Sequence, residues 1–153
     1  MKRREQGFTL VEIAIVLVII GLLLGGIMKG QEMIVQAKIK NAIADFSGVS
    51  AAYFGYQDRY RATPGDDAGA ARWTGASPGN GDRLLTGLYS SATVTDESRL
   101  WWDHLRRSGF IAGAGTLQPE NAFNGLLGVQ TGVGTGTPPA AALPNASGGF
   151  LQI

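Results

Sequence analysis

The sequence predicts an α+β fold, in which one long N-terminal α-helix packs on a small, loop-rich head with a short second helix and few strands. Three observations predict this fold. Residues 8–28 are almost entirely apolar, apolar residues then recur at helical spacing as far as about Arg61, and residues 62–153 are rich in Gly, Ala, Ser, Thr and Pro. The 153 residues are enough for one domain.

The apolar run from Phe8 to Met28 is long enough to cross a membrane. Among its 21 residues, only the side chains of Thr9 and Glu12 are clearly polar. A helix of this length spans about 31 Å, close to the ~30 Å hydrocarbon core of a bilayer. Basic residues at positions 2–4 precede the run, so we expect a cytoplasmic N-terminus, with the rest of the chain on the outer side of the membrane.

Two features argue against an ordinary secretory signal peptide or a plain signal anchor. A signal peptide has a shorter apolar stretch that ends at an Ala-x-Ala-like site, whereas residues 25–30 read Gly-Gly-Ile-Met-Lys-Gly. A plain anchor does not explain Glu12, because a carboxylate inside a membrane helix is costly. No Lys or Arg lies on the helix before Lys29, so the partner of Glu12 must come from the chain terminus, another molecule or the interface.

The hexapeptide Gly7-Phe8-Thr9-Leu10-Val11-Glu12 resembles the prepilin peptidase motif of type IV pilins and type II secretion pseudopilins. The resemblance implies that the peptidase cuts between Gly7 and Phe8 and that Phe8 becomes N-methylated. It also implies an assembly role for Glu12, which would pair with the Phe8 amine of a neighbouring subunit and so lower the cost of its burial. Because Phe8 and Glu12 are four residues apart, the pair could instead close within one chain.

Four glycines on the same helix, Gly21, Gly25, Gly26 and Gly30, have two interpretations. They form small-xxx-small pairs, which allow close packing of helices. Each glycine also weakens the helix by up to about 1 kcal/mol relative to Ala. If the helix stretches or melts in a filament, we expect the change in this segment.

From residue 29 the pattern becomes amphipathic and continues the helix to about Arg61. The apolar stripe includes Ile39, Ile43, Phe46, Tyr53 and Tyr60. Pro64 and Gly65 end the helix, which would then be ~50 residues and roughly 80 Å long. We therefore expect a cleaved leader (1–7), a transmembrane or filament-core helix (8–28), an amphipathic helix (29–61) and a head (62–153).

Within the head, a short helix is expected over residues 96–108. Thr95 or Asp96 can cap its start, and Gly109 suits the C′ position. Its expected buried side chains, with one from the following loop, are Leu100, Trp101, Leu105 and Ile111. Short strands are expected at 126–130 and 150–153. The chain stops within a strand-like segment, so a naturally short head and a missing C-terminal part both stay open.

A narrower resemblance concerns residues 56–67, which read Tyr-Gln-Asp-Arg-Tyr-Arg-Ala-Thr-Pro-Gly-Asp-Asp. This segment is similar to a subgroup of prepilin-like proteins with a Pro-Gly-Asp segment after the long helix. The Gly-Asn-Gly turn at 79–81 and the Glu-Ser-Arg-Leu-Trp-Trp-Asp-His-Leu segment at 97–105 fit the same subgroup. The resemblance narrows the family and implies no task.

The sequence predicts no catalytic site. Residues 75–79 match the G-x-S-x-G pattern, and Ser77, Asp96 and His104 even follow the chain order of a hydrolase triad. However, Pro78 has no backbone N–H to offer an oxyanion hole. We expect His104, which lacks convergent partners in the sequence, to be a surface or half-buried residue. Trp73, Trp101 and Trp102 are interpreted as core or subunit-contact residues.

We expect no cofactor, although loops of the head hold oxygen ligands of the kind that calcium uses. The calcium candidates are Asp66, Asp67, Asn80 and Asp82. The resemblance supports this interpretation, since calcium stabilises the heads of some pseudopilins, but Asp and Asn in turns usually act as turn formers. The chain has no cysteine, which excludes disulfides and Cys-type zinc sites.

The sequence thus indicates a structural subunit rather than an enzyme. By resemblance, it would enter the bacterial inner membrane and assemble into a type IV pilus or type II secretion pseudopilus. Its partners would be prepilin peptidase, other subunits and an inner-membrane assembly platform. Residues 1–7 carry a net charge of +2, so the formal charge falls from +1 to −1 without them, and we expect no nucleic-acid partner. The alternative is a single-pass membrane-anchored periplasmic binding module, which would not need Gly7 or Glu12.

Overall fold

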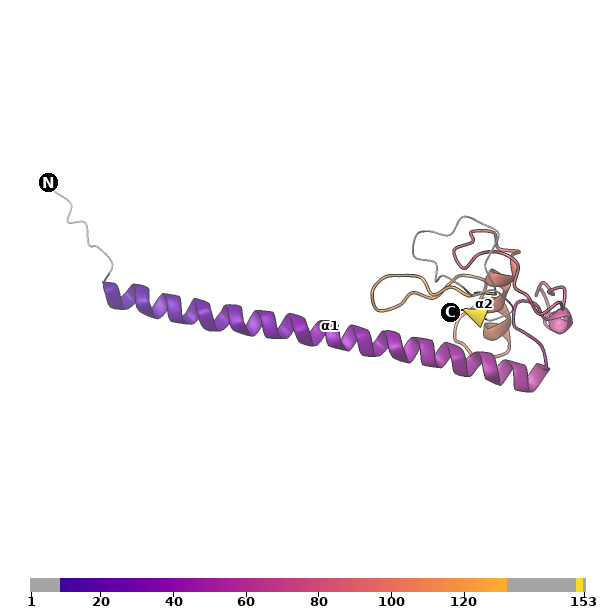
Figure 1. Cartoon of the computed structure of the whole chain (residues 1–153), viewed down its shortest axis with the longest axis horizontal. Coiled ribbons are helices and arrows are strands. Elements are labelled where there is room, and N and C mark those ends of the chain that lie inside the picture. Colours follow the sequence, from indigo (N-terminus) through magenta and orange to yellow (C-terminus); the bar gives the residue numbers. More distant parts are fainter. Residues whose placement is uncertain (1–8, 132–150, 153) are drawn as a thin grey trace. The chain divides into compact units, whose positions relative to one another are not determined.

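The computed structural model describes residues 9–131 and 151–152. They form two units, one that ends at Lys40 and one that begins at Asn41, and from here on the head means this second unit, which includes the end of the long helix. The elements are α1 (Leu10–Tyr60), a 3-10 helix η1 (Ala68–Arg72), α2 (Glu97–Arg107), β1 (Gln130–Thr131) and β2 (Leu151–Gln152) (Figure 1). The predicted α+β fold, with a long first helix, a short second helix and little strand, is confirmed.

Helix α1 is continuous over 51 residues, close to the expected span of 8–61. All side chains between residues 10 and 40 are exposed, including large apolar ones such as Leu10 (85%) and Leu22 (73%). By length and composition the helix can cross a membrane. Apolar side chains are stable in contact with lipid or with other apolar helices, so this part of α1 is suited to either environment.

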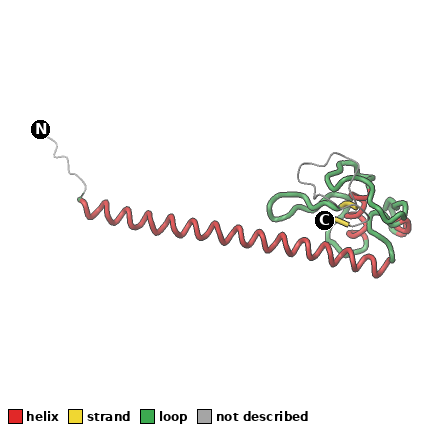
Figure 2. The backbone as a smooth tube through the Cα atoms, viewed as in Figure 1, coloured by secondary structure: helices red, strands yellow, loops and turns green. Residues whose placement is uncertain are grey.

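The core of the head forms where the last turns of α1 meet α2 and the loops around them. Its buried side chains are Val49, Ala52, Tyr56, Leu85, Trp101, Trp102, Leu105, Leu127 and Val129. Leu100 is also buried, while Ile111 and Trp73 pack against the core at intermediate exposure. The predicted burial of α2 is therefore confirmed. Figure 2 shows that loops make up most of the head around this core.

Helix α2 begins and ends within one residue of its predicted limits. Asp96 is the N-cap residue but its side chain makes no capping bond. Instead, the Glu97 and Ser98 backbone N–H groups donate to the hydroxyl and carbonyl of Thr86, at 3.4 and 3.1 Å. Gly109 takes the predicted left-handed C′ conformation, with φ 82°.

The described strands are two short ones, and residues 150 and 153 of the strand expected at 150–153 lie outside the described residues. β1 and β2 pair antiparallel over two residues each, with Gln130 opposite Gln152 and Thr131 opposite Leu151. Before β1, Leu126 forms an isolated antiparallel bridge with Glu120, and the Leu127 N–H donates to the Pro119 carbonyl at 2.8 Å. The expected strand over 126–130 is thus reduced to this bridge and to Gln130, where β1 begins.

Gly65 and Gly109 offer a matched pair for testing the loop geometry, because both have φ near +83°. An added Cβ at Gly109 meets nothing within 4 Å, whereas at Gly65 it would collide with the Glu97 carbonyl oxygen on α2. We expect Gly109→Ala to lower the free energy of unfolding by about 1–2 kcal/mol, and Gly65→Ala by roughly 1–3 kcal/mol more. Thermal unfolding of the full chain in detergent, followed by tryptophan fluorescence, measures the difference. Equal losses would contradict the close approach at Gly65.

Candidate functional site

The first turn of α1 holds Glu12 in a capping box. Thr9 is the residue before the helix, and its backbone N–H and its hydroxyl both donate to Glu12 Oε2 at 2.8 Å. In return, the Glu12 N–H donates to the Thr9 hydroxyl oxygen at 3.3 Å. This reciprocal pattern, Thr-x-x-Glu before an apolar run, is a known helix start. The sequence carried this signal, and the interpretation of Glu12 as an assembly residue overlooked it.

The capping box occupies one oxygen of the Glu12 carboxylate. Within residues 9–131 and 151–152, Oε1 accepts no hydrogen bond. Both partners of Oε2 are neutral, so the carboxylate has no cation beside it in this part of the chain. Glu12 is therefore oriented by its own chain and still able to accept a bond from an ammonium group. Gly7 and Phe8 lie outside the described residues.

The four glycines of the N-terminal unit have no packing partner within the described chain. An added Cβ at Gly21, Gly25, Gly26 or Gly30 would meet nothing within 4 Å, and α1 runs unbroken through all four. Nothing in the described part of a single chain requires glycine at these positions. Their role in helix packing or melting stays a prediction.

In the head, Asp67 joins α1 to η1 through buried polar contacts. Its Oδ2 accepts hydrogen bonds from the Tyr56 hydroxyl at 2.6 Å and from Arg72 at 2.7 Å, and its Oδ1 accepts from the Gly69 N–H at 2.7 Å. Burial alone would raise the pKa of Asp67, but the bonds from Arg72, Tyr56 and Gly69 outweigh it and hold the pKa below its usual value. Burial and the neighbouring Asp67 raise the pKa of Tyr56.

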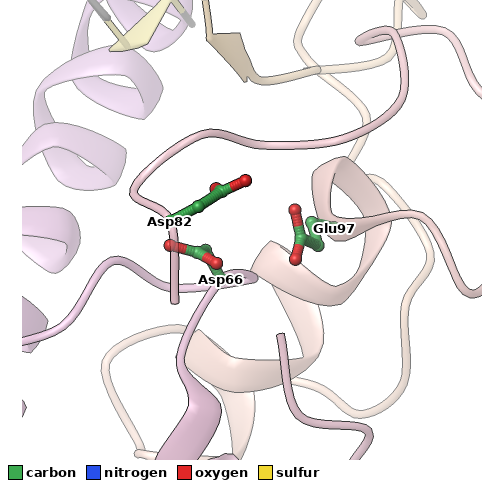
Figure 3. A group of neighbouring side chains, drawn as sticks. All are labelled: Asp66, Asp82 and Glu97. Atoms are coloured by element: carbon green, nitrogen blue, oxygen red, sulfur yellow. The ribbon is translucent and has the colours of Figure 1, made fainter. Parts of the chain in front are cut away.

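Three carboxylates from separate segments, Asp66, Asp82 and Glu97, converge beside this network (Figure 3). One oxygen of each lies within 4.8 Å of the others, and Asp66 and Glu97 are buried.

Both oxygens of each of these three carboxylates accept a hydrogen bond from an N–H group. Gly81 and Arg83 donate to Asp66. Asn80 and Thr86 donate to Glu97, while Leu84 and the Asn80 amide donate to Asp82. The donors to Asp66 and Glu97 compensate the burial of these two carboxylates, and together the bonds fold residues 80–86 around the group.

The structure brings together only part of the predicted calcium set. Asp66 and Asp82 are neighbours, whereas Asp67 faces Tyr56 and Arg72. Asn80 contributes N–H donors rather than an oxygen ligand for the group, since its side-chain oxygen accepts from the Asp82 N–H at 2.9 Å. Glu97 joins the group from the start of α2, 31 residues after Asp66, and no sequence signal pointed to it. Calcium binding stays a prediction.

The prediction that His104 lies at the surface or half-buried is wrong, because its side chain is 0% exposed. The ring links α2 to two loops. Its Nδ1 accepts the Gly65 N–H at 2.9 Å, so Nε2 carries the proton and donates to the Ser77 carbonyl oxygen at 2.9 Å. These partners are backbone groups 39 and 27 residues away, which sequence patterns do not reveal.

The hydrolase-like residues do not form a triad. His104 contacts the carbonyl of Ser77 and not its hydroxyl. Asp96 accepts a hydrogen bond from the Ser91 hydroxyl at 2.5 Å and is not oriented toward the imidazole by any hydrogen bond in the described chain. The arrangement therefore lacks the contacts between nucleophile, base and orienting acid that acyl transfer needs.

We expect the stability of the head to fall as the pH drops below about 6.5, the ordinary pKa of histidine. Burial lowers the pKa of His104, while the Ser77 carbonyl and the charges of Asp67 and Asp103 oppose this shift in part. A group with a lowered folded-state pKa binds its proton more readily in the unfolded chain, so its stabilisation is complete above pH ~6.5 and is lost below it, by at most ~1.4 kcal/mol per pH unit. Denaturant unfolding between pH 7 and 5 measures this slope. A His104→Gln variant with the same slope would contradict it.

Comparison with known proteins identifies the N-terminal segment. Residues 2–28 match the family model described as the Prokaryotic N-terminal methylation motif. No curated protein and no solved structure matches the chain. The motif implies processing by prepilin peptidase and assembly with other pilin subunits, and it points to a structural subunit. The chain therefore carries the N-terminal methylation signal of type IV pilins and pseudopilins, as the residues from Gly7 to Glu12 predicted.

Proposed function

We propose that this chain is a structural subunit of a type IV pilus or a type II secretion pseudopilus. Prepilin peptidase would cut between Gly7 and Phe8, Phe8 would be N-methylated, and the mature chain would join a filament through α1. The match of residues 2–28 to the methylation motif carries this proposal.

Two features of α1 support assembly through this helix. Its side chains between residues 10 and 40 are exposed, and the apolar ones among them gain free energy when another helix or lipid covers them. The Glu12 carboxylate also keeps one oxygen without a hydrogen bond from the described chain, which suits the amine of a neighbouring Phe8. The proposed topology has a cytoplasmic N-terminus, a single inner-membrane span and a periplasmic head.

No match covers the head, so the choice of subgroup and the choice between a filament subunit and a binding module rest on the sequence. The kinship with proteins that carry a Pro-Gly-Asp segment has no support from the comparisons and stays a prediction. The alternative of a membrane-anchored periplasmic binding module does not call for cleavage after Gly7. Processing therefore separates the two functions.

Co-expression with a prepilin peptidase tests the proposal. We expect the membrane-bound chain to become shorter by the seven leader residues only when the peptidase is present. Gly7→Leu should block the change, because the family motif has glycine before the cut, while Gln6→Ala should leave it intact. Equal processing of Gly7→Leu and wild type, or no processing of either, would contradict the proposal and favour a plain anchor.

A further inference from the structure

A cavity of about 540 Å³ opens between the end of α1 and the loops that follow it. Its polar and charged lining residues are Gln57, Arg61, Thr63, Asp66, Asp67 and Arg83. The volume lies in the range of small-molecule sites in proteins. Nothing in the proposed filament function uses this cavity.

Arg61 and Arg83 both lie in this lining with left-handed backbone conformations. Their φ angles are 55° and 68°. A residue with a Cβ loses roughly 1–2 kcal/mol in this conformation, which is why Gly and Asn prevail there. Of the three described non-Gly residues with positive φ, the third is Asn124, a residue type that tolerates it. The two arginines are therefore the unfavourable choices, and both line one cavity.

The backbone bonds at these positions do not explain the arginines. The Arg61 N–H donates to the Gln57 carbonyl at 2.9 Å, and the Arg83 N–H donates to Asp66 Oδ2 at 2.6 Å. A glycine or an asparagine would make both bonds with less strain. Both arginines are exposed, so we look for the reason for arginine in what their guanidinium groups can bind.

Neither guanidinium has a hydrogen bond, ion pair or ring contact with the described part of the chain. The other arginines of the head do have partners, which are carboxylates, carbonyls or aromatic rings. These are Arg59, Arg72, Arg99, Arg106 and Arg107. Arg61 and Arg83 thus differ from their neighbours in conformation and in pairing.

The carboxylates of the lining are already engaged. Asp67 forms an ion pair with Arg72, and both oxygens of Asp66 accept backbone N–H groups. With Arg72 counted against Asp67, the lining alone keeps one positive charge in excess, but Asp82 and Glu97 beside Asp66 bring the local sum to −1, so the longer-range field does not attract an anion. Affinity for an anion would therefore come from direct contact with the two guanidinium groups, which bind phosphate and carboxylate through paired N–H donors.

We propose that this cavity binds a small molecule that carries a phosphate or carboxylate group, held by Arg61 and Arg83. Anion binding offsets the backbone strain at both positions, in the way that strained residues gather at functional sites. The site lies entirely in the head, so it does not depend on processing or filament assembly.

Titration calorimetry on the full chain in detergent tests the site, with pyrophosphate and citrate as probes and sodium chloride at matched ionic strength as reference. We expect at least one probe to bind wild type, and the Arg61→Asn/Arg83→Asn double variant to bind it at least about tenfold more weakly. Arg59→Gln, a nearby arginine outside the lining, should bind like wild type.

Thermal unfolding without anion checks that the double variant is folded, so that a loss of binding cannot come from misfolding. Because asparagine tolerates the left-handed conformation, the double variant should melt no lower than wild type. Unchanged binding by the double variant, or no binding of either probe to wild type, would overturn the proposal. A response to pyrophosphate alone or to citrate alone tells whether the site prefers phosphate or carboxylate.

Discussion

Replacing Glu12 with Ala is expected to leave membrane insertion intact and to lower filament yield by about tenfold or more, the effect of one charge-assisted hydrogen bond. The variant makes α1 more apolar, so insertion should not suffer. It removes the carboxylate oxygen that the described chain leaves unbonded and that the proposal assigns to the Phe8 amine of a neighbour. Membrane fractionation measures insertion, and shearing followed by quantification of the released filaments measures assembly.

Two variants separate assembly from helix capping. Thr9→Ala removes the hydroxyl that bonds with Glu12 but keeps the carboxylate, so it should lower yield much less than Glu12→Ala. Glu32→Ala removes an exposed carboxylate paired with Lys29 on the same helix and should have little effect. Wild-type filament yield from Glu12→Ala, or an equal loss from Glu32→Ala, would contradict the assembly role.

Replacing Asp67 with Ala is expected to destabilise the head by about 3 kcal/mol, which corresponds to a fall in melting temperature of roughly 10 °C or more. Asp67 is 3% exposed, and the change would leave the buried Tyr56 hydroxyl and the Arg72 guanidinium without their shared acceptor. We place the loss at the lower end for a broken buried pair, because the Arg72 side chain is 35% exposed and regains water. Tryptophan fluorescence follows this transition, since all three tryptophans lie in the head.

A double-mutant cycle with Tyr56→Phe identifies the source of the Asp67 effect. Tyr56→Phe removes the hydroxyl but keeps the ring that packs in the core. If the hydrogen bond carries part of the effect, the two substitutions should cost less together than the sum of their separate costs. Strictly additive losses, or a loss below about 1 kcal/mol for Asp67→Ala, would show that the network is not what fixes η1 to α1.

Local patterns in the sequence predicted the helices well. The apolar run and the amphipathic stripe predicted α1 to within two residues at its start and one at its end. This was possible because the helical spacing of apolar residues and the helix-ending Pro64 are both signals that lie within the segment itself. Gly109 likewise marked the end of α2. The capping box was equally local, and Thr9 was readable as the N-cap residue of α1 once Glu12 was considered a helix-start residue.

The polar interior of the head could not be predicted in the same way. His104 is buried because two backbone groups in distant loops saturate its ring, and Glu97 is buried because the turn after Gly79 supplies N–H donors. Such contacts depend on how loops fold back, and no period or spacing encodes them. The same holds for Asp67. Its position in a loop made it a calcium candidate, but in the folded chain its carboxylate lies between Tyr56 and Arg72.

Mass spectrometry of the N-terminal peptide, from chain purified out of membranes that contain prepilin peptidase, tests directly whether the chain is a processed filament subunit. The proposed function predicts a peptide that begins at Phe8, lacks residues 1–7 and carries one methyl group on its amine. A peptide that still begins at Met1 would contradict the proposed function and would leave α1 as a plain membrane anchor.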